Sequence, residues 1–154
     1  MRYVNKFAEV VIVLLFTAIV IVGTLQVFNR YVLNVSLSWS EEFQKFAFIW
    51  LVFIAIPVAY NRAAHLRVDT FLELMPRSVQ LVMRWIIDFL WIGLGMSLVI
   101  FTWRLMQVTR YQSSPGLGIS MSIVYGGMVV GGLYLVLCVA SNMIGRLKSQ
   151  QVAS

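Results

Sequence analysis

The sequence has very little of the chemistry that most catalytic centres use. Its 154 residues include one histidine, His65, and one cysteine, Cys138. These single residues exclude a bis-histidine haem site and a disulfide-exchanging cysteine pair within the chain, and they disfavour a histidine-based metal site. No glycine-rich loop precedes a lysine, so a phosphate-binding loop is also missing. We therefore predict a protein that is not an enzyme, with no catalytic residue, no cofactor and no metal site.

Acidic residues are also scarce. The chain has 6 Asp and Glu residues against 12 Lys and Arg residues, which gives a formal net charge of +6. The carboxylates at Glu9, Glu41, Glu42 and Asp88 all fall near the ends of apolar runs. A proton-coupled exporter of this size needs a buried acid near the middle of a span. The missing mid-span charge argues against autonomous transport, and we interpret Asp88 as an interfacial partner of Arg84, four residues earlier, rather than as a proton carrier.

What the chain does contain is apolar sequence, since 60% of its residues are hydrophobic. Long apolar runs alternate with short polar loops, and about 20 apolar residues suffice for a helix to cross a bilayer. The predicted spans are 8–29, 40–60, 84–104 and 119–145. The first run is too long for a signal peptide and is read as a retained span. We predict an all-α integral membrane protein, with residues 1–154 forming a single membrane domain.

The basic residues indicate how the spans are oriented. One set precedes the first span, separates the second from the third, or follows the fourth: Arg2, Lys6, Arg62, Arg67, Arg77, Arg84, Arg146 and Lys148. Half as many lie on the other side: Arg30, Lys45, Arg104 and Arg110. The positive-inside rule therefore predicts that both termini are cytoplasmic. Between the second and third spans, apolar residues at helical spacing predict a short amphipathic segment on the inner membrane surface.

Two local patterns predict helix contacts. Gly127 and Gly131 stand four residues apart in the fourth span, a small-residue spacing that lets membrane helix backbones approach closely. Ser38 precedes Glu41 by three residues, which is the spacing of a helix capping box. We predict that the glycines mark a packing face and that the second helix begins at Ser38.

Several short motifs occur in order at the ends of the spans. They are the segments 26–34 (QVFNRYVLN), 38–42 (SWSEE), 48–53 (FIWLVF), 64–69 (AHLRVD) and 112–119 (QSSPGLGI). In this order they resemble the small, DctQ-like membrane subunit of tripartite ATP-independent periplasmic (TRAP) transporters. The likeness covers nearly the whole chain, at that family's length and number of spans. One departure is the bulky Leu66-Arg67 pair after His65, where relatives often have a smaller residue.

The resemblance implies a non-catalytic subunit of a sodium-coupled transporter for an organic acid, such as a C4-dicarboxylate, sialic acid or another carboxylate. In that family a periplasmic substrate-binding protein captures the substrate. A large multi-span subunit carries the substrate and sodium sites and moves by an elevator mechanism. The small subunit enlarges the stationary scaffold and helps dock the binding protein.

The expected location is therefore the bacterial inner membrane. The expected partners are the large subunit, the binding protein and membrane lipids, with no nucleic acid and with sodium held by the large subunit. The candidate partner contacts are Arg30, Trp39, Glu41, Glu42, His65, Arg67, Asp69 and Arg110.

Other interpretations remain open from the residues themselves. A four-helix membrane enzyme of the glutathione-transferase type has a similar size, and Arg62, Arg67 and Arg84 lie on one side, but no matching tyrosine accompanies them. An anchor subunit of another membrane complex is a further alternative. Glu41 and Glu42 either cap a helix or meet a partner, and the residues from His65 to Asp69 either meet a partner or organise a turn.

Overall fold

The computed structural model describes residues 2–35, 37–63 and 76–152 of the chain. This part forms four helices: α1 (Arg2–Val32), α2 (Ser38–Ala63), α4 (Arg77–Thr109) and α5 (Met121–Val152). Each contains a stretch long and apolar enough to cross a membrane, namely Val4–Val32, Ser38–Arg62, Val82–Thr109 and Met121–Gly145. The predicted all-α, four-span membrane fold is thus confirmed. The predicted amphipathic segment, with His65, Arg67 and Asp69, lies outside the described residues.

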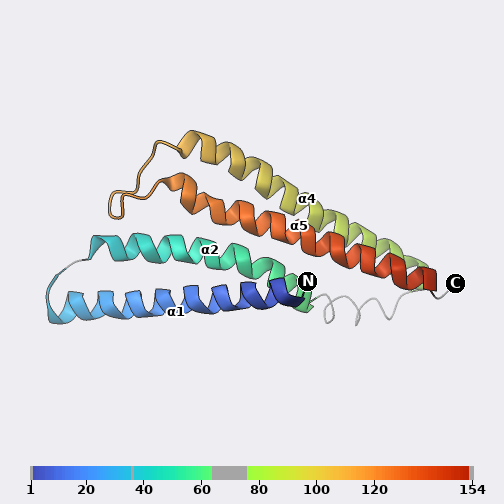
Figure 1. Ribbon diagram of the computed structural model, residues 1–154, viewed down its shortest axis with the longest axis horizontal. Coiled ribbons are helices and arrows are strands. Elements are labelled where there is room, and N and C mark those ends of the chain that lie inside the picture. The colour runs from blue at the N-terminus through green and yellow to red at the C-terminus, as the bar shows by residue number, and fades with distance from the viewer. Residues whose placement is uncertain (1, 36, 64–75, 153–154) are drawn as a thin grey trace.

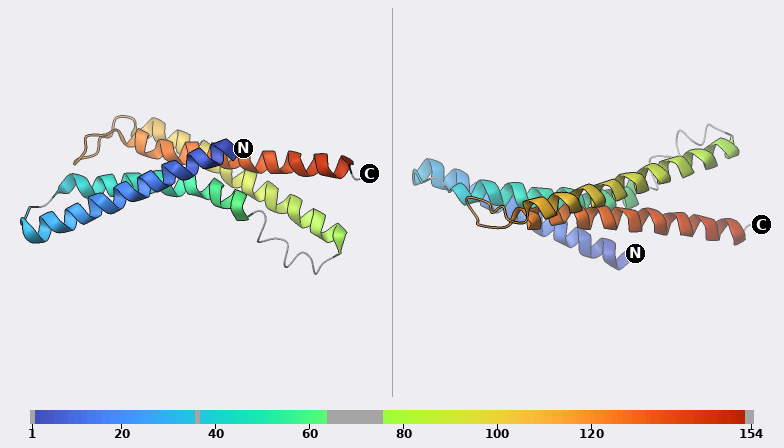
Figure 2. Two further views of the ribbon diagram at one scale, coloured as in Figure 1. Left: turned by 60° about the horizontal axis from the view of Figure 1, so that its bottom comes forward. Right: turned by 90° about the horizontal axis from the view of Figure 1, so that it is seen from above.

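The four helices lie in a row rather than in a closed bundle. α1 packs on α2, α2 packs on α5, and α5 packs on α4 (Figure 1). α1 and α4 form the two edges of the row (Figure 1), and the views in Figure 2 show that the helices cross one another at an angle. We call the end that holds residues 33–37 and 110–120 the loop end, and the end near both chain termini the terminal end. The row therefore consists of two hairpins, α1–α2 and α4–α5, which meet along α2 and α5.

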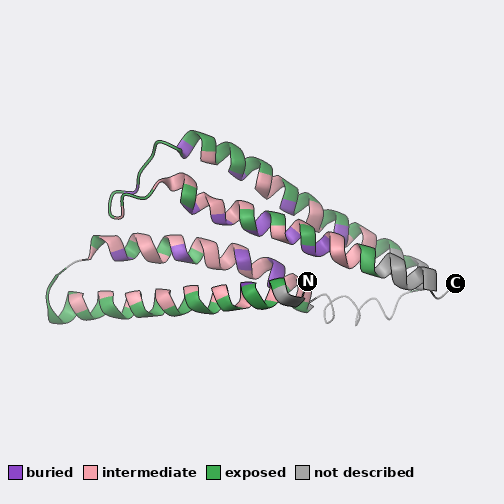
Figure 3. Cartoon of the chain, viewed as in Figure 1, coloured by how far each residue is buried: buried purple, intermediate pink, exposed green. Residues whose placement is uncertain are grey.

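Burial follows this arrangement. α5 lies inside the row and contributes three of the most deeply buried side chains, Leu135, Cys138 and Val139. A smaller cluster of Ala8, Ile54 and Val58 joins α1 to α2. Large apolar side chains cover the outer sides of α1 and α4, as Figure 3 shows by the exposed colour along both helices. In a bilayer these exposed faces meet lipid or another membrane helix, so exposing them does not reduce stability as it would in water.

Glycines on α5 bring its backbone close to both neighbouring helices. A Cβ on Gly131 would lie within 3.0 Å of the backbone carbonyl of Phe53 on α2, and one on Gly127 would lie 2.9 Å from the indole of Trp50. On the other side of α5, a Cβ on Gly132 would lie 3.1 Å from the carbonyl oxygen of Gly95 on α4. The close approach therefore depends on the missing side chains.

The carbonyl that Gly131 contacts has no hydrogen-bond donor within its own helix. Pro57 lies inside α2, is fully buried and has no N–H group. The carbonyl of Phe53, four residues earlier, therefore lacks its partner within the helix. Gly131 on α5 lies against this carbonyl, so closely that a Cβ there would collide with it. Proline on one helix and glycine on the other thus complement each other at the centre of the row.

We expect Gly131→Ala to destabilise the subunit, because the new methyl group would collide with a backbone carbonyl that cannot rotate away. Overpacking of this kind costs about 1–3 kcal/mol. Gly93→Ala on α4 is the matched control, because nothing lies within 4 Å of the Cβ that it would add. Thermal unfolding of the detergent-purified subunit, followed by tryptophan fluorescence, should show a lower midpoint for Gly131→Ala only. Equal midpoints for the two variants would contradict the assigned contact.

Candidate functional site at the loop end

The connection between α4 and α5 is an ordered turn at the loop end. The N–H of Ser114 donates to the carbonyl of Ile119 at 2.9 Å, and the N–H of Met121 donates to the carbonyl of Gln112 at 2.9 Å. The N–H of Gly118 donates to the carbonyl of Ser114 at 2.9 Å. Gly118 has φ +66°, a left-handed conformation that glycine adopts readily. The backbone of residues 112–121 is therefore held by its own hydrogen bonds.

The carboxylate of Glu42 on α2 binds this turn. It accepts hydrogen bonds from the N–H groups of Gly116 and Leu117 at 3.0 Å and a further one from the hydroxyl of Ser114. Consecutive backbone N–H groups that converge on one point form a concave anion site, and bonds to an ionised carboxylate are stronger than neutral ones. We call this set of contacts the Glu42 clamp. It fastens the α4–α5 hairpin to the first turns of α2.

The clamp also depends on close packing of the turn against α2. A Cβ on Gly116 would lie 3.0 Å from a carboxylate oxygen of Glu42 and 3.2 Å from the Cα of Trp39. Ser114 is almost fully buried beneath the turn. The glycine in the Ser-Pro-Gly-Leu sequence is therefore required where the turn touches the α2 backbone.

Glu41 makes a different contact from its neighbour. Its carboxylate accepts a hydrogen bond from the side-chain amide of Gln26 on α1 at 3.3 Å, and Gln26 in turn accepts one from Gln44 at 2.6 Å. The capping box predicted from Ser38 and Glu41 stays a prediction. Helix α2 begins at Ser38 as predicted, and Glu41 links it to α1.

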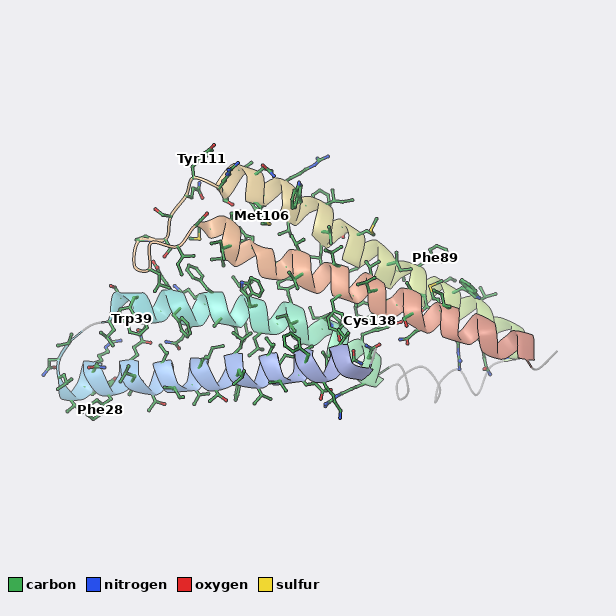
Figure 4. All side chains as sticks on the ribbon, viewed as in Figure 1. Phe28, Trp39, Phe89, Met106, Tyr111 and Cys138 are labelled. Atoms are coloured by element: carbon green, nitrogen blue, oxygen red, sulfur yellow. The ribbon has the colours of Figure 1, made fainter. Side chains whose placement is uncertain are left out.

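The basic candidates at the loop end are exposed. Arg30 lies in the last turn of α1, and Arg110 directly follows α4. The guanidinium of Arg110 lies 5.9 Å from the centre of the Tyr111 ring, and Tyr111 is 90% exposed. Figure 4 shows Tyr111 at the outer edge of the turn, directed away from the helices. In the described part of the chain, neither arginine forms an ion pair with a carboxylate.

The terminal end contains a separate polar network. Asn61 on α2 donates to Asn5 on α1 at 3.2 Å and accepts from Asn142 on α5 at 3.2 Å. The hydroxyl of Tyr134 also donates to Asn5, and Asn61 donates to the sulfur of Cys138 at 3.1 Å. These groups satisfy one another across three helices, so the network is structural rather than a site open to a ligand.

Two other charged contacts lie toward the terminal end. Arg62 pairs with Glu9 at 2.7 Å, but both side chains are substantially exposed, so the pair adds little stability. Asp88 on α4 is buried and accepts a hydrogen bond from the hydroxyl of Tyr60 on α2 at 3.1 Å, while the Tyr60 ring lies edge-on to Trp91. Asp88 therefore helps connect α2 to α4. Its pairing with Arg84 stays a prediction.

The arrangement can hold helices and present a surface, and nothing in its described groups points to bond-making chemistry. Within residues 2–35, 37–63 and 76–152, no group of three His, Cys, Asp or Glu side chains is placed to hold a metal ion. The candidate site therefore consists of the Glu42 clamp and the exposed Arg110–Tyr111 pair. Of the predicted contacts, the clamp brings Glu42 and Trp39 close to the turn, whereas Arg30 and Glu41 lie on the α1–α2 side.

Sequence reasoning missed several residues of this site. Tyr111 and Gln44 were not singled out. Gln26 and Ser114 lie in motifs that the sequence analysis quotes, but their contacts were not predicted, although polar residues inside apolar helices are a usable signal for interhelical hydrogen bonds. No such signal exists for the N–H groups of Gly116 and Leu117, because every non-proline residue carries one.

Comparisons with known proteins agree with this architecture. Residues 19–149 match the family described as "Tripartite ATP-independent periplasmic transporters, DctQ component". The chain is 23% identical over 146 residues to a protein of Haemophilus influenzae named as a TRAP transporter small permease, a match that covers 95% of this chain and 91% of the relative. It is 24% identical over 136 residues to the sialic acid TRAP transporter small permease protein SiaQ of Vibrio cholerae, covering 88% of this chain and 78% of that one.

A longer relative matches as well. The isethionate TRAP transporter permease protein DctMQ of Oleidesulfovibrio alaskensis is 32% identical over 117 residues, which cover 70% of this chain but only 18% of the relative. With four membrane-spanning helices and a family match across most of its length, the chain is a multi-pass protein of the bacterial inner membrane. It belongs to the DctQ family, the small permease subunits of TRAP transporters.

Proposed function

We propose that this small permease subunit enlarges the stationary scaffold of a large membrane subunit and helps dock a periplasmic substrate-binding protein. The observation that carries the proposal is the open row of helices. α1 contacts α2 at one edge of the row, α4 contacts α5 at the other, and both present long apolar faces (Figure 3). An open row of this kind provides a wide apolar surface against which a second membrane protein can pack.

The longer relative supports a large partner. In the isethionate permease the matching segment is 18% of one polypeptide, so a DctQ-like region and a much longer permease occur in a single chain. Regions fused in one protein are commonly separate subunits of one complex in another. We therefore propose that this chain binds a large permease subunit and that the sodium ions bind that subunit.

The proposed substrate is an organic anion. The named relatives belong to transporters of sialic acid, a carboxylate, and isethionate, a sulfonate. In the described part of this chain the buried acid, Asp88, already accepts a hydrogen bond from Tyr60. We propose that the choice between organic anions is made by the binding protein and the large subunit.

We propose that the loop end faces the periplasm, because the smaller share of basic residues lies there. A cysteine placed at Ser113, which is exposed in the turn, should react with a membrane-impermeant thiol reagent added to intact spheroplasts. A cysteine at Ser149, in the last turns of α5, should react only after the membrane is opened. The background variant Cys138→Ser removes the native thiol and keeps an acceptor for Asn61. Labelling of the two positions in the opposite order would reverse the proposed orientation.

We also expect no transport by this subunit alone. Liposomes that contain only this chain should take up no organic acid when a sodium gradient is applied, because a transport site requires ionisable or ion-coordinating groups within the membrane. Uptake should appear when the large subunit and a loaded binding protein are supplied. Radiolabelled substrate counts, with the complete transporter as the positive control, provide the measurement. Sodium-driven uptake by the small subunit by itself would refute the scaffold role.

A further inference from the structure

The loop end has a net positive charge, because four basic side chains lie there with two carboxylates. Both carboxylates are engaged within the chain, since Glu42 binds the turn and Glu41 accepts a hydrogen bond from Gln26. The basic side chains are exposed and, in the described part of the molecule, are not in ion pairs. These side chains are Arg30, Lys45, Arg104 and Arg110. A partner that complements this end must therefore present acidic groups.

The Arg110–Tyr111 pair has the properties of a binding contact. Tyrosine and arginine are enriched among the residues that dominate binding energy in protein interfaces. Tyr111 is 90% exposed and points outward, and the guanidinium of Arg110 lies 5.9 Å from its ring centre (Figure 4). The pair thus presents an aromatic face and a cation side by side, beyond the end of α4.

The turn that carries this pair is held by hydrogen bonds within the chain. The hydroxyl of Ser120 donates to the carbonyl of Arg110 at 3.2 Å, and the N–H of Gln112 donates to the carbonyl of Thr109 at 3.0 Å. The Glu42 clamp then ties the far side of the same turn to α2. A contact held in its final geometry loses less conformational entropy on binding.

We infer that the Arg110–Tyr111 pair is the contact through which this subunit receives an acidic surface of the periplasmic binding protein, and that Glu42 is the residue that positions it. The inference rests on the proposed docking function and deepens it. It assigns a chemistry to the partner surface and separates two roles that the sequence does not distinguish. Arg110 and Tyr111 touch the partner, whereas Glu42 acts through the turn.

The first test measures binding directly. The complex of this chain with its large subunit is placed in nanodiscs of zwitterionic lipid, and the binding protein encoded in the same gene cluster is titrated onto it. Arg110→Gln and Tyr111→Ala should each raise the Kd about tenfold, the effect of losing one strong interface contact. The Arg110→Gln effect should shrink as salt is raised. Lys6→Gln, which removes the same charge at the terminal end, should change the Kd less than about twofold.

The outcomes separate the inference from the proposed function. If Arg110→Gln and Tyr111→Ala each bind the binding protein with the Kd of the wild-type complex, the Arg110–Tyr111 assignment is wrong, while the proposed docking function stands. If the variants differ from wild type only in nanodiscs that contain anionic lipid, the pair contacts lipid headgroups and the inference also fails. A wild-type complex that binds no binding protein at any salt concentration contradicts the proposed docking function, and the inference with it.

The second test addresses Glu42 and uses its neighbour as the matched control. Glu42→Gln removes the charge that the turn binds, whereas Glu41→Gln removes the same charge from a carboxylate that does not touch the turn. Hydrogen exchange at the N–H groups of Gly116 and Leu117 should become faster in Glu42→Gln only, and the Kd for the binding protein should rise at least threefold in that variant only.

Ser114→Ala provides a second way to weaken the clamp while leaving the charge in place, and co-purification of the large subunit checks assembly. Ser114→Ala should give faster exchange at the same two N–H groups and a smaller rise in Kd than Glu42→Gln gives. Unchanged exchange in both clamp variants, or equal Kd values for Glu42→Gln and Glu41→Gln, would overturn the positioning role.

Discussion

The structure depends above all on the close approach of α2 and α5, because this contact joins the two hairpins into one subunit. Lipid tails are as apolar as leucine, so membrane helices gain little from hiding apolar surface against each other and must rely on close packing. Gly127 and Gly131 allow that approach, and Trp50 and the carbonyl of Phe53 fill the space that the glycines leave. Pro57 exposes the same carbonyl by removing its partner within α2.

The same contact determines which other side chains of α2 and α5 face each other. On α2, Glu42, Trp50, Phe53 and Asn61 recur at spacings that place them on one helical face, as Gly127, Gly131, Cys138 and Asn142 do on α5. A polar clamp therefore closes the contact at the loop end, glycines close it in the middle, and an asparagine network closes it at the terminal end. Rotating α2 by one residue would break all three together. The polar groups lie at the two ends, while the middle is held by packing.

Part of this could be read from the sequence and part could not. Hydropathy predicted four helices because the bilayer imposes a length and forbids unpaired backbone groups, and the Gly127/Gly131 spacing indicated a packing face. Helix order in the row depends on which faces meet, and side-chain type alone does not determine that.

The partner of Glu42 could not be predicted for another reason. Its ligands are backbone N–H groups on a turn, and its hydrogen bond with Ser114 joins residues 72 positions apart in the chain. For Glu41 the helix-cap spacing suggested a local role, but a glutamine on α1 competes for the same carboxylate.

The contacts of Glu41 and Glu42 determine which charged groups the loop end presents to another protein. Had both glutamate side chains projected toward a partner, they could also bind basic groups there. Glu42 instead binds the turn and Glu41 accepts a hydrogen bond from Gln26, while the arginines are exposed and outside any ion pair in the described part of the chain. The same contacts resist sliding of one hairpin along the other, because displacement would break hydrogen bonds at both ends and force the central glycines against larger groups. A subunit held at three levels in this way resists internal rearrangement, and the contacts that hold it at the loop end are the same ones that occupy its two carboxylates.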